Sequence, residues 1–128
     1  MSIRKRLGAL AFASAVGLAG CADNPEYHYN GKIGEEQVNF YETELGEYNI
    51  LIVTKSDGSK AEYYDILSND LKLDYVDFTV GKNTTSYSAG SKNPEVQAVV
   101  KKAQARFDWY LKKITEIQTA RFLREDRE

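Results

Sequence analysis

The stretch NILIVTKSDGSKAEYYDI, residues 49–66, decides the fold. Its first part, residues 49–55, is rich in β-branched side chains, and its last part, residues 60–66, contains two adjacent tyrosines. β-Branched and aromatic residues favour strands. Between the two parts lies Asp57-Gly58, a dipeptide typical of the type I′ turn, which needs positive φ at both central positions. The sequence therefore predicts an antiparallel hairpin here.

Further β-strands are expected on both sides of this hairpin. Residues 37–43 alternate between apolar and polar side chains, as a half-buried strand does. Residues 71–80 and 84–88 flank Gly81-Lys82-Asn83 and predict a second hairpin. In the 71–80 run the alternation changes phase between Tyr75 and Val76. We therefore expect either a strand covered on both faces or a β-bulge at that step.

A long helix is predicted after residue 93. Asn93-Pro94-Glu95 combines an N-cap residue, a proline suited to the first helical position and an acid in the first turn. No Gly or Pro follows up to about Arg124. Thirty helical residues span about 45 Å, whereas ordinary strands span about 17–20 Å. The helix should therefore overhang the sheet or break near Thr115. Its apolar side chains recur at steps of four and three: Val96, Val100, Ala103, Phe107, Tyr110, Ile114 and Ile117, with Val99 and Leu111 beside them.

These elements predict one α+β domain over residues 32–128. It should be an antiparallel β-meander of about five strands, followed by one long C-terminal helix packed on it. A coiled-coil seam with another chain is the alternative use of the apolar helix face, although Phe107 and Tyr110 are bulky for a narrow seam. Residues 21–31 show no periodicity and are expected to form a short tether.

The amino-terminal segment has the three parts of a secretory signal. Arg4, Lys5 and Arg6 precede an apolar run, Leu7–Leu18, and small residues follow it. The run is shorter than the roughly 20 residues that a membrane-spanning helix needs. We therefore expect residues 1–20 to be a signal peptide.

The tetrad Leu18-Ala19-Gly20-Cys21 resembles the lipobox of bacterial lipoproteins. The resemblance implies cleavage between Gly20 and Cys21 and acylation of the Cys21 thiol, with palmitate as a typical chain. Two acyl chains anchor a protein stably, whereas one holds it only reversibly. Ala22, and not Asp, follows Cys21. In a diderm host this implies the outer membrane, so the lipid bilayer is the expected partner.

The composition excludes several classes of function. The chain has 17 Lys and Arg against 19 Asp and Glu, a net charge of −2. Loss of Arg4, Lys5 and Arg6 with the signal would leave about −5, which disfavours nucleic-acid binding. Cys21 is the single Cys and His28 the single His. We therefore expect no intramolecular disulfide, no Ser-His or Cys-His pair, no transition-metal site and no cofactor.

Residues 66–77 resemble calcium loops of the EF-hand and integrin-repeat type. Such loops place oxygen ligands at alternating positions and an acid at the last one. Ile66 at the first position cannot be a ligand, and Leu71 stands where the sharp turn requires Gly. We therefore favour an Asn-Asp turn that leads into a strand, and we expect no tight calcium binding. The ligand set of the calcium alternative is Asp65, Asp70, Asp74 and Asp77.

The expected function is that of a membrane-anchored envelope lipoprotein with a non-enzymatic binding or structural role. Its ligand is not specified by the sequence, and an envelope protein is a further expected partner. The alternative is a calcium-dependent binding module that uses the acidic loop of residues 65–77. A small enzyme is the least expected class, because no nucleophile–base pair is evident.

Overall fold

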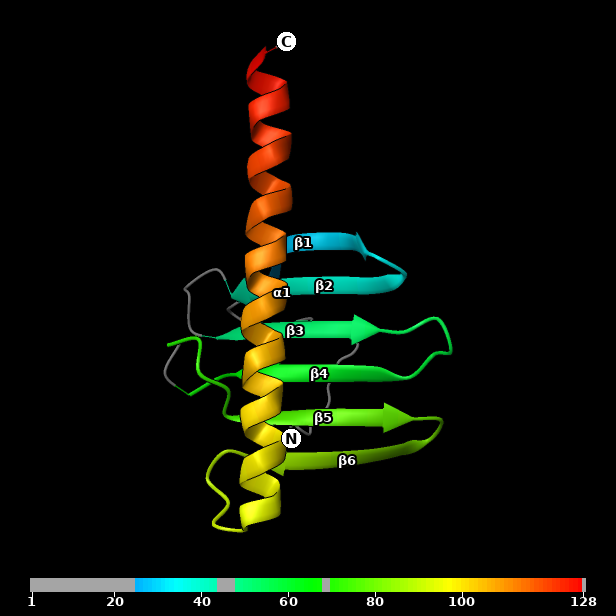
Figure 1. Cartoon of the computed structure of the whole chain (residues 1–128), viewed down its shortest axis with the longest axis vertical. Coiled ribbons are helices and arrows are strands. Elements are labelled where there is room, and N and C mark those ends of the chain that lie inside the picture. The colour runs from blue at the N-terminus through cyan, green and yellow to red at the C-terminus, as the bar shows by residue number, and fades with distance from the viewer. Residues whose placement is uncertain (1–24, 44–47, 68–69, 128) are drawn as a thin grey trace.

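The computed structural model describes residues 25–43, 48–67 and 70–127. Six strands form one antiparallel sheet in chain order, and one helix follows them (Figure 1). The predicted α+β fold is therefore confirmed, with six strands in place of about five. The elements are β1 (Pro25–Ile33), β2 (Glu36–Thr43), β3 (Asn49–Thr54), β4 (Lys60–Asp65), β5 (Tyr75–Val80), β6 (Asn83–Ser88) and α1 (Pro94–Arg127).

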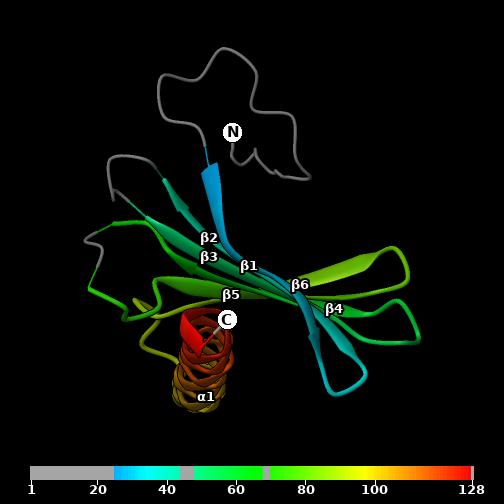
Figure 2. The ribbon, with the colours of Figure 1, turned by 90° about the horizontal axis from the view of Figure 1, so that it is seen from above.

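The helix α1 crosses the strands on one face of the sheet, so the fold has two layers (Figure 2). The predicted apolar face of α1 lies in this interface, and the ring of Tyr63 lies 6.2 Å from Phe107 and 6.4 Å from Tyr110. Packing of the helix on its own sheet is thus confirmed. The buried core consists of Tyr29, Val38, Leu51, Val53, Tyr63, Leu73 and Val76 below the helix, and of Ala103, Phe107, Tyr110 and Ile114 on it.

The additional strand is β1, which covers most of the segment predicted to be a tether. The tether over residues 21–31 is therefore a wrong prediction from Pro25 onward, and the domain begins before residue 32. The pairing of β1 with β2 shifts between Tyr27 and Tyr29, where a β-bulge interrupts the alternation. The Tyr29 hydroxyl donates to the Lys32 carbonyl at 2.9 Å, across Gly31. A Cβ at Gly31 would lie 3.1 Å from that hydroxyl, so a larger residue there would require the Tyr29 side chain to shift.

The phase change at residues 75–76 has a different cause from the two that were expected. β5 begins only at Tyr75, and its register with β4 is continuous. Leu73 lies in the preceding loop, where it is 4% exposed and contributes to the core. Its backbone N–H donates to Oε1 of Gln104 at 2.8 Å, which fixes this loop to α1.

The β3–β4 hairpin is confirmed, but its turn is not the predicted type I′. The loop spans residues 55–59, and the Lys55 N–H donates to the Ser59 carbonyl at 2.8 Å. Gly58 has a φ of 90°, whereas Asp57 does not adopt positive φ. The Asp57 carboxylate instead accepts hydrogen bonds from the N–H and hydroxyl of Ser59 at 2.9 and 2.7 Å. This loop is longer than a two-residue turn and is stabilised by a side chain.

The helix begins as predicted and continues without a break. The Asn93 side chain accepts a hydrogen bond from the Glu95 N–H at 2.8 Å, as an N-cap does. α1 runs through Thr115, so a break there is excluded, and its last turns project beyond β1 (Figure 1). Phe122 and Leu123 are exposed in this overhang. Within the described ranges, no helix has the length and apolar character needed to cross a membrane.

Candidate binding groove

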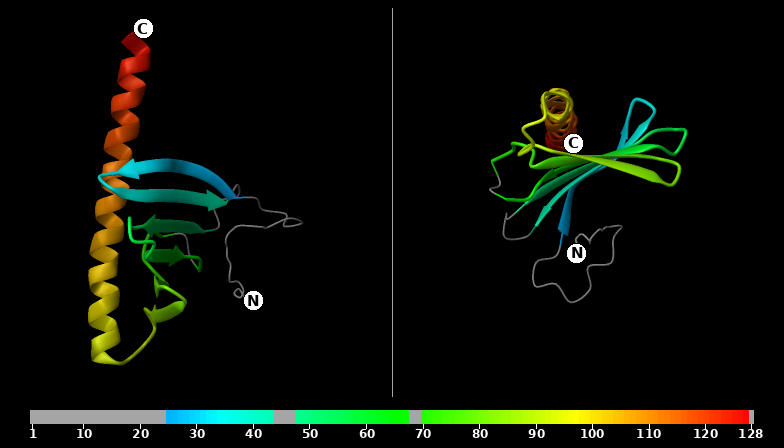
Figure 3. Two further views of the ribbon diagram at one scale, coloured as in Figure 1. Left: turned by 90° about the vertical axis from the view of Figure 1, so that its right-hand side faces the viewer. Right: turned by 90° about the horizontal axis from the view of Figure 1, so that it is seen from below.

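The helix lies nearer one end of the strands, and the hairpin ends extend away from it (Figure 3). This offset leaves part of the helix-facing side of the sheet uncovered, beside the β3–β4 hairpin. A groove of about 430 Å³ lies there, between α1 and strands β3 to β5. Small-molecule sites commonly occupy 300–1,000 Å³. The groove is therefore large enough for a small ligand.

The apolar floor of the groove results from one cross-strand row. Val53 pairs with Ala61, and Ala61 pairs with Phe78, so these three side chains lie side by side on the helix-facing side. Ala61 is the smallest of them, and it lowers the floor between its two larger neighbours. Val99 and Ala103 of α1 form the opposite wall. The small side chain of Ala61 thus contributes to the depth of the groove between Val53 and Phe78.

Positive charge surrounds this floor. Lys55 of the hairpin loop and Lys102 and Arg106 of α1 line the groove, and no lining residue carries a carboxylate. Lys60 also contributes to the lining, and its ammonium lies 3.9 Å from the Glu62 carboxylate. The groove therefore combines an apolar floor with a cationic rim.

Arg106 is held at the end of the groove by a short hydrogen-bonded chain. Its guanidinium donates to the Tyr110 hydroxyl at 3.3 Å, and that hydroxyl donates to the Glu36 carboxylate of β2. Burial raises the pKa of Tyr110 to about 12 and also raises the pKa of Tyr63. Both phenols are therefore neutral at pH 7.

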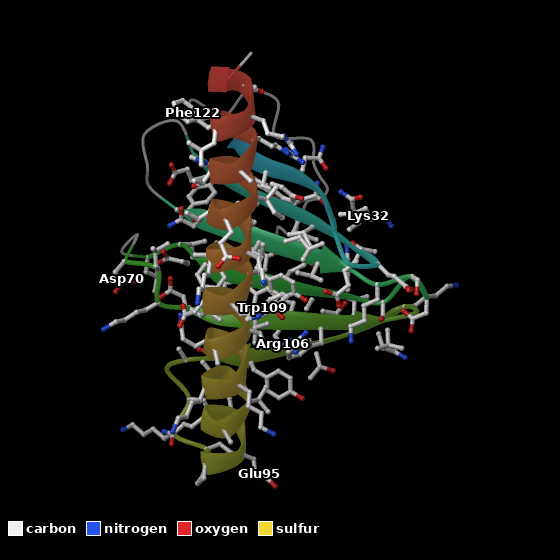
Figure 4. All side chains as sticks on the ribbon, turned by 45° about the horizontal axis from the view of Figure 1, so that its top comes forward. Lys32, Asp70, Glu95, Arg106, Trp109 and Phe122 are labelled. Carbon is white, nitrogen blue, oxygen red and sulfur yellow. The ribbon has the colours of Figure 1, made fainter. Side chains whose placement is uncertain are left out.

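A second hollow of about 340 Å³ adjoins the groove beyond Arg106 and Tyr110. Trp109 lines it and is 47% exposed, and Figure 4 shows Arg106 and Trp109 on the same side of the helix. The rings of Trp109 and Tyr110 pack edge to face, with their centroids 5.0 Å apart. The Lys113 ammonium lies over the Trp109 ring, 5.6 Å from its centroid. One side of the helix thus presents aromatic and cationic groups over several turns.

The other face of the sheet carries a carboxylate pair that sequence reasoning missed. Glu62 and Asp77 are direct cross-strand partners. Burial raises the pKa of each, and the charge of Asp77 adds to the effect on Glu62. The hydroxyls of Tyr64 and Ser86 donate to them at 2.9 and 2.6 Å. The register of β4 with β5 creates this pair, and no motif along the chain indicates that register.

The four carboxylates of the calcium alternative accept hydrogen bonds from different groups and do not share a common site. Asp65 is fully buried, and its Oδ2 accepts hydrogen bonds from Asn49 Nδ2 at 2.9 Å and from the Leu71 N–H at 2.8 Å. Asp74 accepts from two consecutive backbone N–H groups, those of residues 66 and 67. Asp70 accepts from the Lys72 N–H at 3.0 Å. These carboxylates shape the β4–β5 connection.

The remaining member, Asp77, lies within β5 and bonds to β6. Leu71 adopts a φ of 64°, the left-handed conformation for which the calcium loop uses Gly. Across the described ranges, no three His, Cys, Asp or Glu side chains are placed to hold a metal ion. The geometry therefore gives no support to a calcium site at Asp65, Asp70, Asp74 and Asp77.

The structure leaves two of the predicted positions undescribed and places the histidine outside the groove lining. The lipidation and cleavage positions, Cys21 and Gly20, fall outside the described residues. His28 is exposed on β1, with Nε2 placed 2.6 Å from the Glu42 carboxylate. The one histidine therefore belongs to the surface of the edge strand.

Comparison with protein-family models, with curated proteins and with solved structures finds no match.

Proposed function

We propose that this chain is a lipid-anchored binding protein of the bacterial cell envelope, without enzymatic activity. Acylated Cys21 would hold it to the membrane, and the groove beside α1 would hold its ligand. The observation that carries the binding role is the apolar floor of the groove under a cationic rim. In a diderm host the location would be the outer membrane.

The chemistry of the groove supports binding over catalysis. General acid–base catalysis at neutral pH works best with a group whose pKa lies near 7. The lining residues comprise apolar side chains, hydroxyls, lysines and one arginine, without a carboxylate or an imidazole. Burial raises the pKa values of the two lining tyrosines, Tyr63 and Tyr110, above the ordinary tyrosine value, so neither phenol exchanges protons readily near pH 7. These groups suit orientation of an anion.

The position of the anchor supports a role at the membrane surface. Pro25, the first residue of β1, is the fourth residue after Cys21, and an extended chain over these four steps spans at most about 14 Å. Acylation of Cys21 would therefore keep the sheet close to the bilayer. A ligand taken from the membrane or from a neighbouring envelope protein would be within reach of the groove.

Fatty-acid labelling in a bacterial host tests the anchor. The full chain should incorporate labelled palmitate and partition into the detergent phase. Cys21→Ser should lose both properties, because the serine hydroxyl does not replace the thiolate in formation of the thioether. A wild-type chain recovered wholly in the aqueous phase, or cleaved at another bond, would contradict the proposal.

A further inference from the structure

We propose that the groove binds a single-chain lipid with an anionic head group. The alkyl chain would lie on the row formed by Val53, Ala61 and Phe78, and the head group would meet Lys102 and Arg106. This inference rests on the proposed binding function and names its class of ligand.

The shape of the groove fits one alkyl chain. Its helical wall runs from Val99 to Tyr110, which corresponds to roughly 16 Å along the helix axis. The volume of about 430 Å³ lies in the lower part of the range for small-molecule sites. An extended dodecyl chain has about the same length as the groove, whereas a two-chain lipid needs more room.

The charges at the rim select an anionic head group. Lys102 and Arg106 are four residues apart on α1, so they project from the same side of the helix. Lys55 adds a third positive charge at the hairpin, with Asp57 as its acidic neighbour in the loop. Guanidinium and ammonium groups bind carboxylate and phosphate oxygens by charge-assisted hydrogen bonds. A cationic head group would be repelled at the same place.

The backbone of the floor favours an alkyl chain over a peptide segment. A peptide that enters an apolar groove must find partners for its N–H and C=O groups. The floor lies on β3, β4 and β5, and each of these strands is paired on both sides. The floor therefore offers no strand edge to a peptide, whereas an alkyl chain needs no hydrogen bonds.

Photoaffinity labelling of the full chain in native membranes tests this assignment. Two probes would share a dodecyl chain with one diazirine and differ only in the head group, a carboxylate in one and a trimethylammonium in the other. After irradiation, peptide mass spectrometry locates the labelled residues. We expect the carboxylate probe to label groove residues, and excess dodecanoate to suppress this labelling. The trimethylammonium probe should label the groove at least fivefold less.

Two matched pairs of variants locate the site. Ala61→Leu fills the lowest part of the floor and should reduce groove labelling to a tenth or less, whereas Ala98→Leu on the exposed side of α1 should leave it unchanged. Lys102→Glu should lower labelling by the carboxylate probe about fivefold, since such a change corresponds to about 1 kcal/mol for one exposed ion pair. It should also raise labelling by the trimethylammonium probe. Lys101→Glu makes the same change of net charge outside the groove lining and should alter neither probe.

Several outcomes would overturn the inference. These are equal groove labelling by both probes, labelling confined to residues outside the groove, or equal effects of the variants at residues 101 and 102. Any of them would leave the palmitate test at Cys21 unaffected, so failure of the ligand class can be distinguished from failure of the anchor. A normal unfolding transition for Ala61→Leu excludes loss of the fold as the cause of its effect.

Discussion

At the scale of single residues, Phe107 joins the two layers of the fold. Its side chain is fully buried, and its ring lies 6.2 Å from that of Tyr63 in β4. Truncation of a buried Phe removes apolar contacts and leaves a cavity. We expect Phe107→Ala to lower the free energy of unfolding by about 3–5 kcal/mol. Urea unfolding followed by circular dichroism measures this change.

The control for Phe107 is on the exposed face of the same helix. Lys112→Ala should change the free energy of unfolding by no more than about 0.5 kcal/mol. A loss below about 1 kcal/mol for Phe107→Ala, the ordinary cost of a point substitution, would contradict its place in the core.

The Glu62–Asp77 pair predicts a dependence of stability on pH. Burial raises the pKa of Glu62, so the folded state binds its proton more tightly than the unfolded state. Such a group favours folding below its unfolded pKa, and this contribution is lost as the pH rises through the folded pKa. We therefore expect Glu62→Gln to raise the free energy of unfolding at pH 7, since the amide keeps the acceptor for Tyr64 and removes the buried charge.

Near pH 3, below the ordinary glutamate pKa, Glu62→Gln should bring no gain, because the carboxyl is already neutral in both states. Denaturant unfolding at the two pH values provides the comparison. Glu35→Gln, a change at an exposed turn residue, serves as the control. An equal effect of Glu62→Gln at both pH values would show that this carboxyl carries no burial cost.

At the scale of elements, the helix has a packed part and a projecting part. Tyr110 and Ile114 belong to the buried core, whereas Phe122 and Leu123 are exposed beyond β1. A chain that ends at Arg121 should therefore melt within a few degrees of the full chain. A chain that ends at Asp108 loses two core side chains and should show no cooperative transition.

Differential scanning calorimetry of the two shortened chains checks this division. The chain ending at Arg121 keeps the contact of its guanidinium with the Tyr29 ring, at 5.6 Å. Cooperative melting of the chain ending at Asp108 would mean that the sheet is stable without the helix. A large loss in the chain ending at Arg121 would mean that the overhang stabilises the fold.

Local patterns predicted the elements whose signals lie in neighbouring residues. Asp57-Gly58 indicated the β3–β4 hairpin, and Asn93-Pro94 indicated the start of α1, because turns and caps depend on a few consecutive residues. β1 was missed because the bulge at Tyr27–Tyr29 and the residues Pro25 and Gly31 interrupt its alternation. The sequence did not decide whether α1 breaks near Thr115 or continues beyond the sheet. Helix propensity describes the helix alone and does not give the width of the sheet on which it packs.

The groove depended on information that no local pattern contains. Val53, Ala61 and Phe78 come from three strands, and they form one row only because of the register between them. The spacing of the aspartates within residues 65–77 could be seen in the sequence. The buried partner of Asp65, Asn49, lies on another strand, so the structural role of that carboxylate was not visible.

At the scale of the whole molecule, the helix joins the beginning of the fold to its end. Each strand pairs with its neighbours in the chain, so the sheet needs only short-range connections. The helix adds contacts of long sequence separation, such as Tyr110 with Glu36 and Gln118 with the His28 carbonyl. The turn around Gln118 thereby lies against β1, the strand that follows Cys21 in the chain. The groove and β1, the strand that the proposed anchor precedes in the chain, thus belong to the same two-layer arrangement of sheet and helix.

This arrangement predicts that anchoring and folding are separable. In the described part of the chain, every core residue lies at Tyr29 or later, so Cys21→Ser replaces none of them. The full chain with Cys21→Ser should lose its acyl chains and yet retain slow hydrogen exchange at the buried backbone of β3 and α1. Exchange measured by mass spectrometry on the wild-type chain in membranes and on the Cys21→Ser chain recovered from the same host tests this. Fast exchange of β3 in the Cys21→Ser chain would show that the anchor stabilises the sheet. Unchanged protection together with lost palmitate would assign Cys21 to location alone, and ligand binding to the sheet and helix.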